Sequence, residues 1–446
     1  MAKELSISPI TRLIGDGGVK ILLNDKGAVK DVKLGIYSTR FFEKFAEGRQ
    51  AEFLPRIAPR ICGACSIPHH IASTKSIEDA WSITIPPTAK KLRQLLLHAS
   101  FYTSHLQHFF TRAAPDFIFG IGATPEERNI MNLIKEKPDV GSMALKMMDF
   151  GQNICAEMGG KAVHPVTAIP GGMTKVLSEE ARDRFLKQID EQMDFSRKAV
   201  EYGTKIMNDR MDVFKSVVPL PTFSTGLTNN GIHDVYEGNL RVISPDGKSE
   251  DFDPRNCIDA IAEHVAPHSY ATHAYIKKAG YPAGLVTTNC LARLNCVEKM
   301  ATPLAQTAFE QFRGTFGKPC FSPLASNWAR LVEMTQSLEI IAALLKDPEI
   351  VSKDIKEPNI VAKDGMGVGI VEGSRGMHIY NIWTDEKGLI KKLNIIAATN
   401  LNVGSMEMIL KKNAVSLLEK KAGTEQLNTL EMIARAFDLC MPCAAH

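Results

Sequence analysis

Apolar residues recur along most of the chain at helical spacing, which predicts a mainly α protein with small β elements. Between residues 88 and 112, Leu92, Leu95, Leu96 and Ala99 fall three or four positions apart, on one face of a helix. Two further helical segments precede the C-terminus. The other segments with this spacing lie near residues 178–210, 257–279, 299–316 and 327–346.

Two hairpin patterns flank this helical body, one near each end of the chain. Alternating apolar residues at 19–23 and 28–37 surround the turn sequence Asn-Asp-Lys-Gly, and those at 377–383 and 389–397 surround Asp-Glu-Lys-Gly. Short Gly-containing turns between such runs are typical of β-hairpins. Because no repeat, low-complexity tract or linker interrupts the sequence, we expect a single domain over residues 1–446.

The amino-acid composition limits the classes of binding partner that we expect for this chain. The chain has 53 basic and 50 acidic residues, and its net charge of +3 gives no reason to expect nucleic acid or an anionic membrane surface. A content of 44% hydrophobic and 23% charged residues is ordinary for a globular protein. The apolar runs are too short to span a membrane, and the N-terminus lacks a secretory pattern. We therefore expect a cytoplasmic protein without membrane insertion.

Cysteine provides the most specific chemical signal. An odd count of nine cysteines, without a secretory signal, argues against a framework of disulfides. Four of them form two Cys-x-x-Cys pairs, Cys62 with Cys65 and Cys440 with Cys443. Each pair brings two thiolates within reach of one metal ion, so two pairs supply four sulfur ligands if the fold brings them together.

The spacing alone leaves the metal open. A structural zinc or a simple iron–sulfur cluster is the commonest use of four cysteines. Zinc ribbons, however, hold both pairs within a few tens of residues, whereas these pairs lie near opposite ends of the chain. A purely structural site at a chain end would also be prone to fraying.

The residues around both pairs resemble the two signatures of nickel–iron hydrogenase large subunits. The first reads Arg60-Ile-Cys-Gly-Ala-Cys65 with His69 four residues on, and the second reads Asp438-Leu-Cys-Met-Pro-Cys-Ala-Ala-His446. The segment 82–88 and the motif around Pro115-Asp116 are most similar to the cytoplasmic, NAD-linked bidirectional branch. Further matches, in the family's order, lie at residues 9–12, 40–43, 164–165, 171–172, 372–376 and 397–399.

This resemblance implies a fold and an activity. The fold would be the hydrogenase large-subunit helical body with β-hairpins near both ends. The chain would be an oxidoreductase of hydrogen metabolism, cleaving and forming H2 heterolytically at a nickel–iron centre whose iron carries carbon monoxide and cyanide. By position, Cys62 and Cys440 would be terminal nickel ligands, and Cys65 and Cys443 would bridge nickel to iron.

The resemblance also implies catalytic groups around the metals. Cys440 would take up the proton as a thiolate, and Arg375 would lie over the open metal position. Asp116 and Asp438 would flank Arg375, because a guanidinium between carboxylates is held by forked hydrogen bonds. Without its motif, Arg375 would instead be interpreted as a surface salt-bridge residue.

Four more residues have implied supporting roles. His69 would donate a hydrogen bond to a bridging sulfur, although a lone histidine is usually an ordinary core residue. Thr399 would bond either a cyanide or the backbone at a strand end. Glu43 and His446 resemble the ligands of a second, structural metal, usually magnesium, although Glu43 alone would suit a surface salt bridge.

Electrons must leave the active site through a partner subunit, because the sequence contains no further cysteine cluster that could hold an iron–sulfur relay. The family supplies an iron–sulfur small subunit, with NAD- or ferredoxin-reactive subunits beyond it, so we expect a heteromeric complex. A different hypothesis is a metal-free structural subunit, such as the fold-mate in respiratory NADH dehydrogenases that helps to form a quinone site. A third is a zinc-stabilised interaction protein.

The chain departs from the family pattern at four positions. Ile14 stands where the family has a glutamate that passes protons out of the site, and isoleucine cannot carry a proton. Leu439 and Ser374 each replace a usual proline, and Tyr380 replaces a common histidine. Asp16 is the nearest titratable residue to Ile14 in the same motif, so we expect a water-assisted path with Asp16 as a candidate relay.

Overall fold

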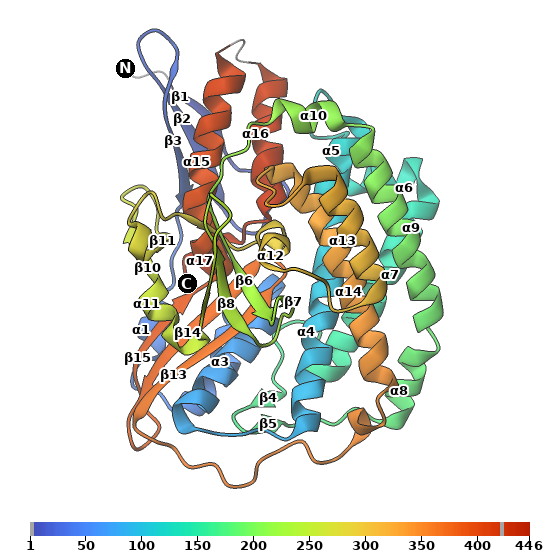
Figure 1. Ribbon diagram of the computed structural model, residues 1–446, viewed down its shortest axis with the longest axis vertical. Coiled ribbons are helices and arrows are strands. Elements are labelled where there is room, and N and C mark those ends of the chain that lie inside the picture. Colours follow the sequence, from blue (N-terminus) through green and yellow to red (C-terminus); the bar gives the residue numbers. More distant parts are fainter. Residues whose placement is uncertain (1–3, 420–422) are drawn as a thin grey trace.

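In the computed structural model, which describes residues 4–419 and 423–446, a layer of long helices lies beside small sheets (Figure 1). Helix α4 (Pro87–His108) packs against α7 (Pro138–Gly159) and α14 (Ser326–Lys346), and α14 packs against α9 (Ile189–Asn208). These faces are buried because their apolar residues recur at helical spacing, as α4 illustrates with Leu92, Leu95 and Leu96. The mainly helical fold class expected from the sequence is confirmed.

The predicted helix over 178–210 is interrupted. Ser178 caps α8 (Glu179–Leu186) by accepting a hydrogen bond from the backbone N–H of Ala181, and a new helix, α9, starts at Ile189. The predictions near 299–316 and 327–346 are confirmed by α13 (Pro303–Phe316) and α14. The shorter helices are α1 (Phe42–Ala46), α2 (Leu54–Ile57), α5 (Ala114–Phe119), α6 (Ile130–Glu136), α10 (Met211–Ser216) and α12 (Cys290–Cys296).

The helix predicted over 257–279 is wrong. Only α11 (Cys257–Ala260) is helical there, and β10 (Ile261–Val265) pairs with β11 (Thr272–Ile276) as an antiparallel hairpin. Pro267 has no backbone N–H and disfavours helix in the residue before it. Ile261 from β10 and the alternate residues Ala274 and Ile276 from β11 join a second, smaller hydrophobic cluster, so packing favours strands over the helical spacing.

Both expected hairpins are confirmed, and each gains a third strand. The N-terminal sheet has the order β1 (Glu4–Ile7), β2 (Gly17–Leu23), β3 (Val29–Ile36). The C-terminal sheet has the order β13 (Gly365–Gly373), β14 (Gly376–Thr384), β15 (Ile390–Ile396). The first two strands of that second sheet are joined by the tight turn Ser374-Arg375, which carries one of the candidate site residues.

Helix α3 (Ser66–Trp81) lies directly on this C-terminal sheet. A β carbon placed on Gly369 would lie 2.0 Å from the carbonyl oxygen of Ala72, so only glycine allows the strand to approach the helix this closely. The helix begins immediately after Cys65, and β13 leads into the turn that carries Arg375. Backbone contact between them therefore fixes the first cysteine pair relative to that turn.

A five-stranded sheet in the middle of the chain was not predicted. Its strands are short and joined by irregular loops, and one pairing, β12 with β6, is parallel. Non-local pairing of this kind leaves little trace in local periodicity. The strands are β6 (Phe223–Asn229), β7 (Ile232–His233), β8 (Asn239–Ile243), β9 (Ser249–Phe252) and β12 (Val286–Thr287), and a separate pair is formed by β4 (Ala168–Ile169) and β5 (Gly172–Met173).

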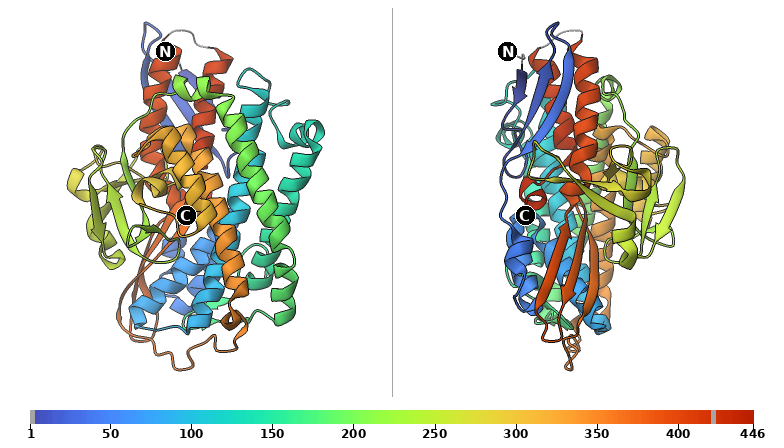
Figure 2. Two further views of the ribbon diagram at one scale, coloured as in Figure 1. Left: turned by 45° about the vertical axis from the view of Figure 1, so that its right-hand side comes forward. Right: turned by 90° about the vertical axis from the view of Figure 1, so that its left-hand side faces the viewer.

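The C-terminal segment ends about midway along the length of the molecule (Figures 1 and 2), and the residues just before His446 are buried. Helices α15 (Ala398–Leu418) and α16 (Thr424–Phe437) lead to the single turn α17 (Met441–Ala444). Ile14 pairs with Cys440 as an isolated bridge, and the Met441 backbone N–H donates to the Ile14 carbonyl oxygen at 2.9 Å. No helix within the described ranges is long and apolar enough to cross a membrane.

Candidate metal centre

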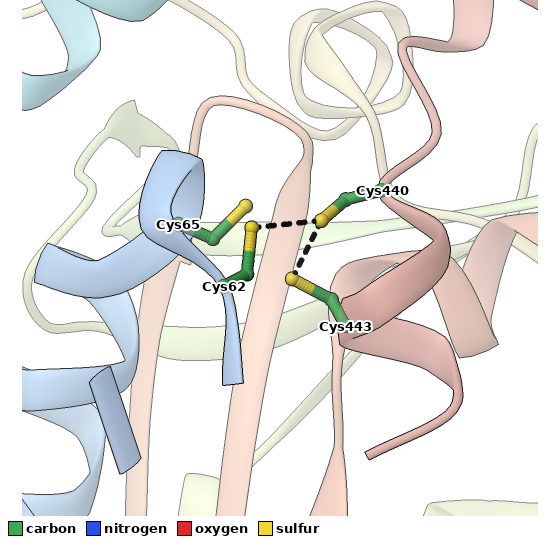
Figure 3. Close-up of side chains that lie close together, drawn as sticks. All are labelled: Cys62, Cys65, Cys440 and Cys443. Atoms are coloured by element: carbon green, nitrogen blue, oxygen red, sulfur yellow. Dashed lines mark hydrogen bonds between the residues drawn. The ribbon is translucent and has the colours of Figure 1, made fainter. Parts of the chain in front are cut away.

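The four paired cysteines converge on one buried point (Figure 3). Cys62 and Cys65 lie on the short turn before α3, and Cys440 and Cys443 lie at the start of and within α17. All four Sγ atoms lie within 4.8 Å of one another. The Cys62–Cys440 and Cys440–Cys443 sulfur distances are 3.0 Å and 2.9 Å. The two cysteine pairs therefore meet, as the metal hypothesis requires.

The donor set fits a soft metal. The sulfur separations are well above the ~2.05 Å of a disulfide bond, so these are four separate ligand atoms. The neighbouring thiols hydrogen-bond to Cys65 and lower its pKa well below the ordinary value, so this sulfur is the readiest to ionise. Burial raises the pKa of Cys440 and Cys443. A bound cation would reverse that burial effect, because thiolate is the ligand form.

Arg375 lies beside the cysteine cluster. Its Nη1 is 3.5 Å from the Cys65 Sγ, and its Nη2 donates to the Asp438 Oδ1 at 3.3 Å. Burial alone would lower the pKa of this guanidinium, but Asp438 and the cysteine sulfurs hold the pKa well above its ordinary value. Arg375 therefore keeps its charge and its donors fixed, and it does not release a proton.

Asp438 anchors three arginines, two of which the sequence did not indicate. Its carboxylate lies 2.7 Å from Arg112, 3.5 Å from Arg330 and 3.1 Å from Arg375. Burial would raise the pKa of Asp438, but Arg375 and the other neighbouring cations hold it well below the ordinary value. No local spacing marks Arg112 or Arg330, since each reaches the carboxylate from a different helix.

The structure does not bring Asp116 together with Arg375. Asp116 is buried in a separate cluster, where it pairs with Arg12, Arg128 and Arg435. The Asp116 Oδ2 lies 2.9 Å from Arg435, whose helix leads directly to the second cysteine pair. The expectation that Asp116 flanks Arg375 is therefore corrected. Its cluster ties the N-terminal segment to the helix before the site.

His69 lies between a cysteine and a tyrosine. Its Nε2 is 3.4 Å from the Cys443 Sγ, and its Nδ1 is 2.7 Å from the Tyr380 hydroxyl. Burial lowers the pKa of His69, so the ring is neutral, and burial raises the pKa of Tyr380, so the phenol keeps its proton. When the phenol donates to Nδ1, the N–H at Nε2 points at the sulfur.

The remaining expected residues lie around the second cysteine pair. The Thr399 Oγ1 accepts the Cys440 backbone N–H at 3.0 Å, from the first turn of α15 rather than from a strand end. His446 Nε2 lies 3.5 Å from the Glu43 carboxylate. The His446 Nδ1 donates to the Cys443 carbonyl oxygen at 2.8 Å, which directs the other ring nitrogen toward Glu43.

A buried arginine that the sequence did not single out supports the Arg375 turn. Arg293 donates to the carbonyl oxygens of Gly373 at 2.9 Å and Ser374 at 3.2 Å. Glu333 holds Arg293 through two hydrogen bonds of 2.7 and 2.6 Å. Because both carbonyls belong to the turn and its preceding residue, this fork fixes the turn's orientation toward the cysteines.

The N-terminal motif lies beside the same cluster. Ile14 pairs with Cys440 and lines a cavity next to the cysteines. Asp16, two residues further on, is exposed and is not among the residues that line this cavity. The structure therefore provides no direct support for Asp16 as a proton relay.

Two family descriptions match the N-terminal part of the chain. One described as "Nickel-dependent hydrogenase" matches residues 40–137, and one described as "HoxL-like" matches residues 4–38. The first range contains Glu43, the first cysteine pair, His69 and Asp116. The matched segments thus include several of the residues singled out above.

Relatives extend the similarity over nearly the whole chain. One of them, a component of the F420-non-reducing hydrogenase vhu of Methanocaldococcus jannaschii, is 43% identical over 412 residues, which is 92% of this chain and 98% of that protein. The beta component of the NAD-reducing hydrogenase HoxS of Cupriavidus necator is 32% identical, over 100% of this chain and 95% of that protein. The solved structure of an NAD+-reducing NiFe-hydrogenase in the H2-reduced state has a TM-score of 0.95 and 31% identity, covering 100% of this chain and 99% of that chain.

Proposed function

Because this chain belongs to the large subunits of the nickel-dependent hydrogenases, we propose that Cys62 and Cys440 bind nickel alone and that Cys65 and Cys443 bridge it to iron. The chain is a hydrogenase catalytic subunit with a nickel–iron centre, an oxidoreductase acting on H2. The observation that carries the proposed ligand roles is the convergence of four buried sulfurs from both ends of the chain. A metal-free structural subunit would not require four cysteine sulfurs to lie together.

The bound metals supply the Lewis acidity and redox capacity that heterolytic cleavage of H2 requires. The protein side chains then have two tasks, which are to accept the proton released from H2 and to hold charged groups in fixed positions around the metals. We assign the first task to the Cys440 thiolate, because the neighbouring Arg375 keeps its own protons. Arg375 presents fixed positive charge over the sulfurs, while Asp438 holds it by a buried ion pair.

The experiment that tests this proposal is metal analysis combined with infrared spectroscopy of the purified complex. We expect about one nickel per chain, in keeping with a single four-sulfur site. We also propose that carbon monoxide and cyanide bind the iron, and these give infrared bands in a region free of protein absorption. Zinc in place of nickel, with no such bands, would contradict the proposal and favour a zinc-stabilised subunit.

A magnesium ion between Glu43 and His446 is the second proposed metal. Its support is the 3.5 Å approach of the Glu43 carboxylate to His446 Nε2 at the end of α17. Glu43→Gln removes the charged ligand, so we expect magnesium affinity to fall about 10- to 100-fold, measured as magnesium retained after dialysis. Glu47→Gln, which affects only an exposed pair with Lys44, is the matched control. Normal magnesium retention in Glu43→Gln would show that no magnesium binds here.

We further propose an iron–sulfur small subunit that covers the face near the first cysteine pair. Exposed aromatic side chains at Phe41, Phe45 and Phe53 precede that pair and are typical of a protein interface. The other five cysteines are buried and, within residues 4–419 and 423–446, belong to no second four-sulfur group. Electrons must therefore leave through a partner.

This partner proposal predicts that the isolated chain cannot reduce acceptor proteins rapidly with H2. The measurement compares H2-dependent reduction of NAD and of ferredoxin by the isolated chain and by the whole complex. We expect activity with the complex only, because a buried two-electron site without a relay cannot discharge to a large acceptor. A purified single chain that reduces NAD directly with H2 would refute the proposal.

The physiological acceptor is NAD or ferredoxin in this proposal, reached through further subunits. The NAD-reducing relative and the NAD+-reducing solved structure support the first of these. We also propose a cytoplasmic location and a single domain over residues 1–446. Support for the single domain comes from the main hydrophobic cluster, which includes residues from Ile10 to Ala445.

A further inference from the structure

A cavity of about 320 Å³, lined by both polar and apolar side chains, lies next to the metal centre. Its inner end is at Ser104, which is buried, and its outer rim includes the exposed residues Gln107 and Val163. A space of this size with polar groups in its lining has room for several water molecules. The side chains that supply its hydroxyl and amide groups belong to Ser66, Ser100, Thr103, Ser104, Gln107 and Gln152.

Two serine hydroxyls join this cavity to the cysteine cluster. The Ser104 and Ser374 Oγ atoms are 2.8 Å apart, and Arg375 Nη1 lies 3.3 Å from the first and 3.4 Å from the second. The same Nη1 is 3.5 Å from the Cys65 Sγ. The sulfur and the Ser104 hydroxyl are therefore less than about 7 Å apart, a gap that one or two water molecules span.

We propose that the Ser104–Ser374 hydroxyl pair passes protons between the cysteine cluster and the water of this cavity. This inference rests on the proposed function, since it supplies the proton exit for that reaction. A proton taken up at Cys440 passes to the Cys65 sulfur, which lies within 4.8 Å of it, and then leaves the Cys65 S–H as a thiolate and binds a serine oxygen through the intervening water. That serine releases its own proton to the next oxygen, so neither hydroxyl changes and the proton ends in the cavity.

The other polar groups beside the cysteines are less suited to this task. Arg375 is fixed between Cys65 and Asp438, and the Asp438 carboxylate is occupied by ion pairs with three arginines. Ile14 lines the cavity with an apolar side chain, and Asp16 is exposed outside it. A hydroxyl both accepts and donates, which a fixed guanidinium cannot do.

The first test needs no metal. The full chain without metals is transferred to D2O, and infrared spectroscopy follows exchange of the cysteine S–H band, with the Cys65 contribution isolated by subtracting the Cys65→Ala spectrum. We expect Ser104→Ala combined with Ser374→Ala to slow Cys65 exchange at least tenfold. Ser76→Ala, a buried helical serine bonded only to its own helix, is the control and exchanges at the original rate. An unchanged rate in the double variant would overturn the proposal.

The second test uses the nickel-loaded complex. We expect the double alanine variant to lose at least tenfold in H2 turnover with unchanged nickel content, and serine-to-threonine changes, which keep the hydroxyls, to retain most of it. Loss with threonine as well would indicate a structural role and contradict the proposal. Slowed thiol exchange in a protein that never binds nickel would support the serine path while refuting the proposed function, so the two failures are distinguishable.

Discussion

Replacing Cys62 with serine is expected to remove nickel from the protein and abolish hydrogen turnover. The Cys62 sulfur lies 3.0 Å from that of Cys440 and takes part in the only set of four sulfurs found among the described residues. A serine hydroxyl is a harder donor that stays protonated, so it is a poor ligand for nickel. We expect nickel content to fall below about a tenth of the original value, measured by elemental analysis of the purified complex.

Cys257→Ser is the matched control for this change. Cys257 is also buried, but its sulfur lies 3.5 Å from an Asn381 side-chain oxygen, away from the four-sulfur group. We expect this variant to keep its nickel and its turnover. Full nickel content and activity in Cys62→Ser would exclude the four-cysteine assignment.

The Arg375→Lys variant is expected to keep its nickel and lose turnover by about 10²-fold or more, the size of effect found when a fixed donor is removed from a reacting centre. The Arg375 guanidinium contacts two groups at once, because Nη1 faces the Cys65 sulfur and Nη2 pairs with the Asp438 carboxylate. Lysine keeps the charge but lacks the planar fork, so it cannot satisfy both sides in one geometry. The measurements are H2 turnover and nickel content of the same preparation.

Arg241→Lys provides the comparison for a merely structural arginine. Arg241 makes a forked pair with Asp251 on the edge of the five-stranded sheet. In the sequence, it is well separated from both Cys-x-x-Cys pairs. We expect its substitution to leave turnover within about twofold, as is usual for exposed ion pairs. Equal turnover in Arg375→Lys and the original protein would show that Arg375 only supports the fold.

Local patterns predicted the elements whose stability is local. The hairpins near both ends are confirmed because alternation and Gly turns specify them within about 20 residues. The helices α4, α13 and α14 are confirmed for the same reason, since their apolar faces repeat within each segment. The five-stranded sheet was missed because its pairing depends on residues far apart in the chain.

The residues of the candidate site likewise divide into those that local motifs predicted and those that depend on the fold. The cysteine pairs were identifiable because each pair is a short motif, and their meeting is now observed. Asp116 was placed wrongly beside Arg375, because three other arginines compete for the same carboxylate and only the fold decides among them. Arg293 carries no motif at all, yet it holds the turn on which Arg375 stands.

The meeting of the two cysteine pairs would also change the free energy of the unfolded protein once a metal joins them. A metal that joins Cys62 to Cys440 links residues 378 positions apart, which closes a loop of most of the chain. In the chain-entropy description of cross-links, closing a loop this long lowers the entropy of the unfolded state by an amount worth on the order of 5 kcal/mol at 25 °C. As long as it stayed bound to both cysteine pairs, the proposed metal would therefore also be a topological cross-link that opposes global unfolding by restricting the conformations of the denatured chain.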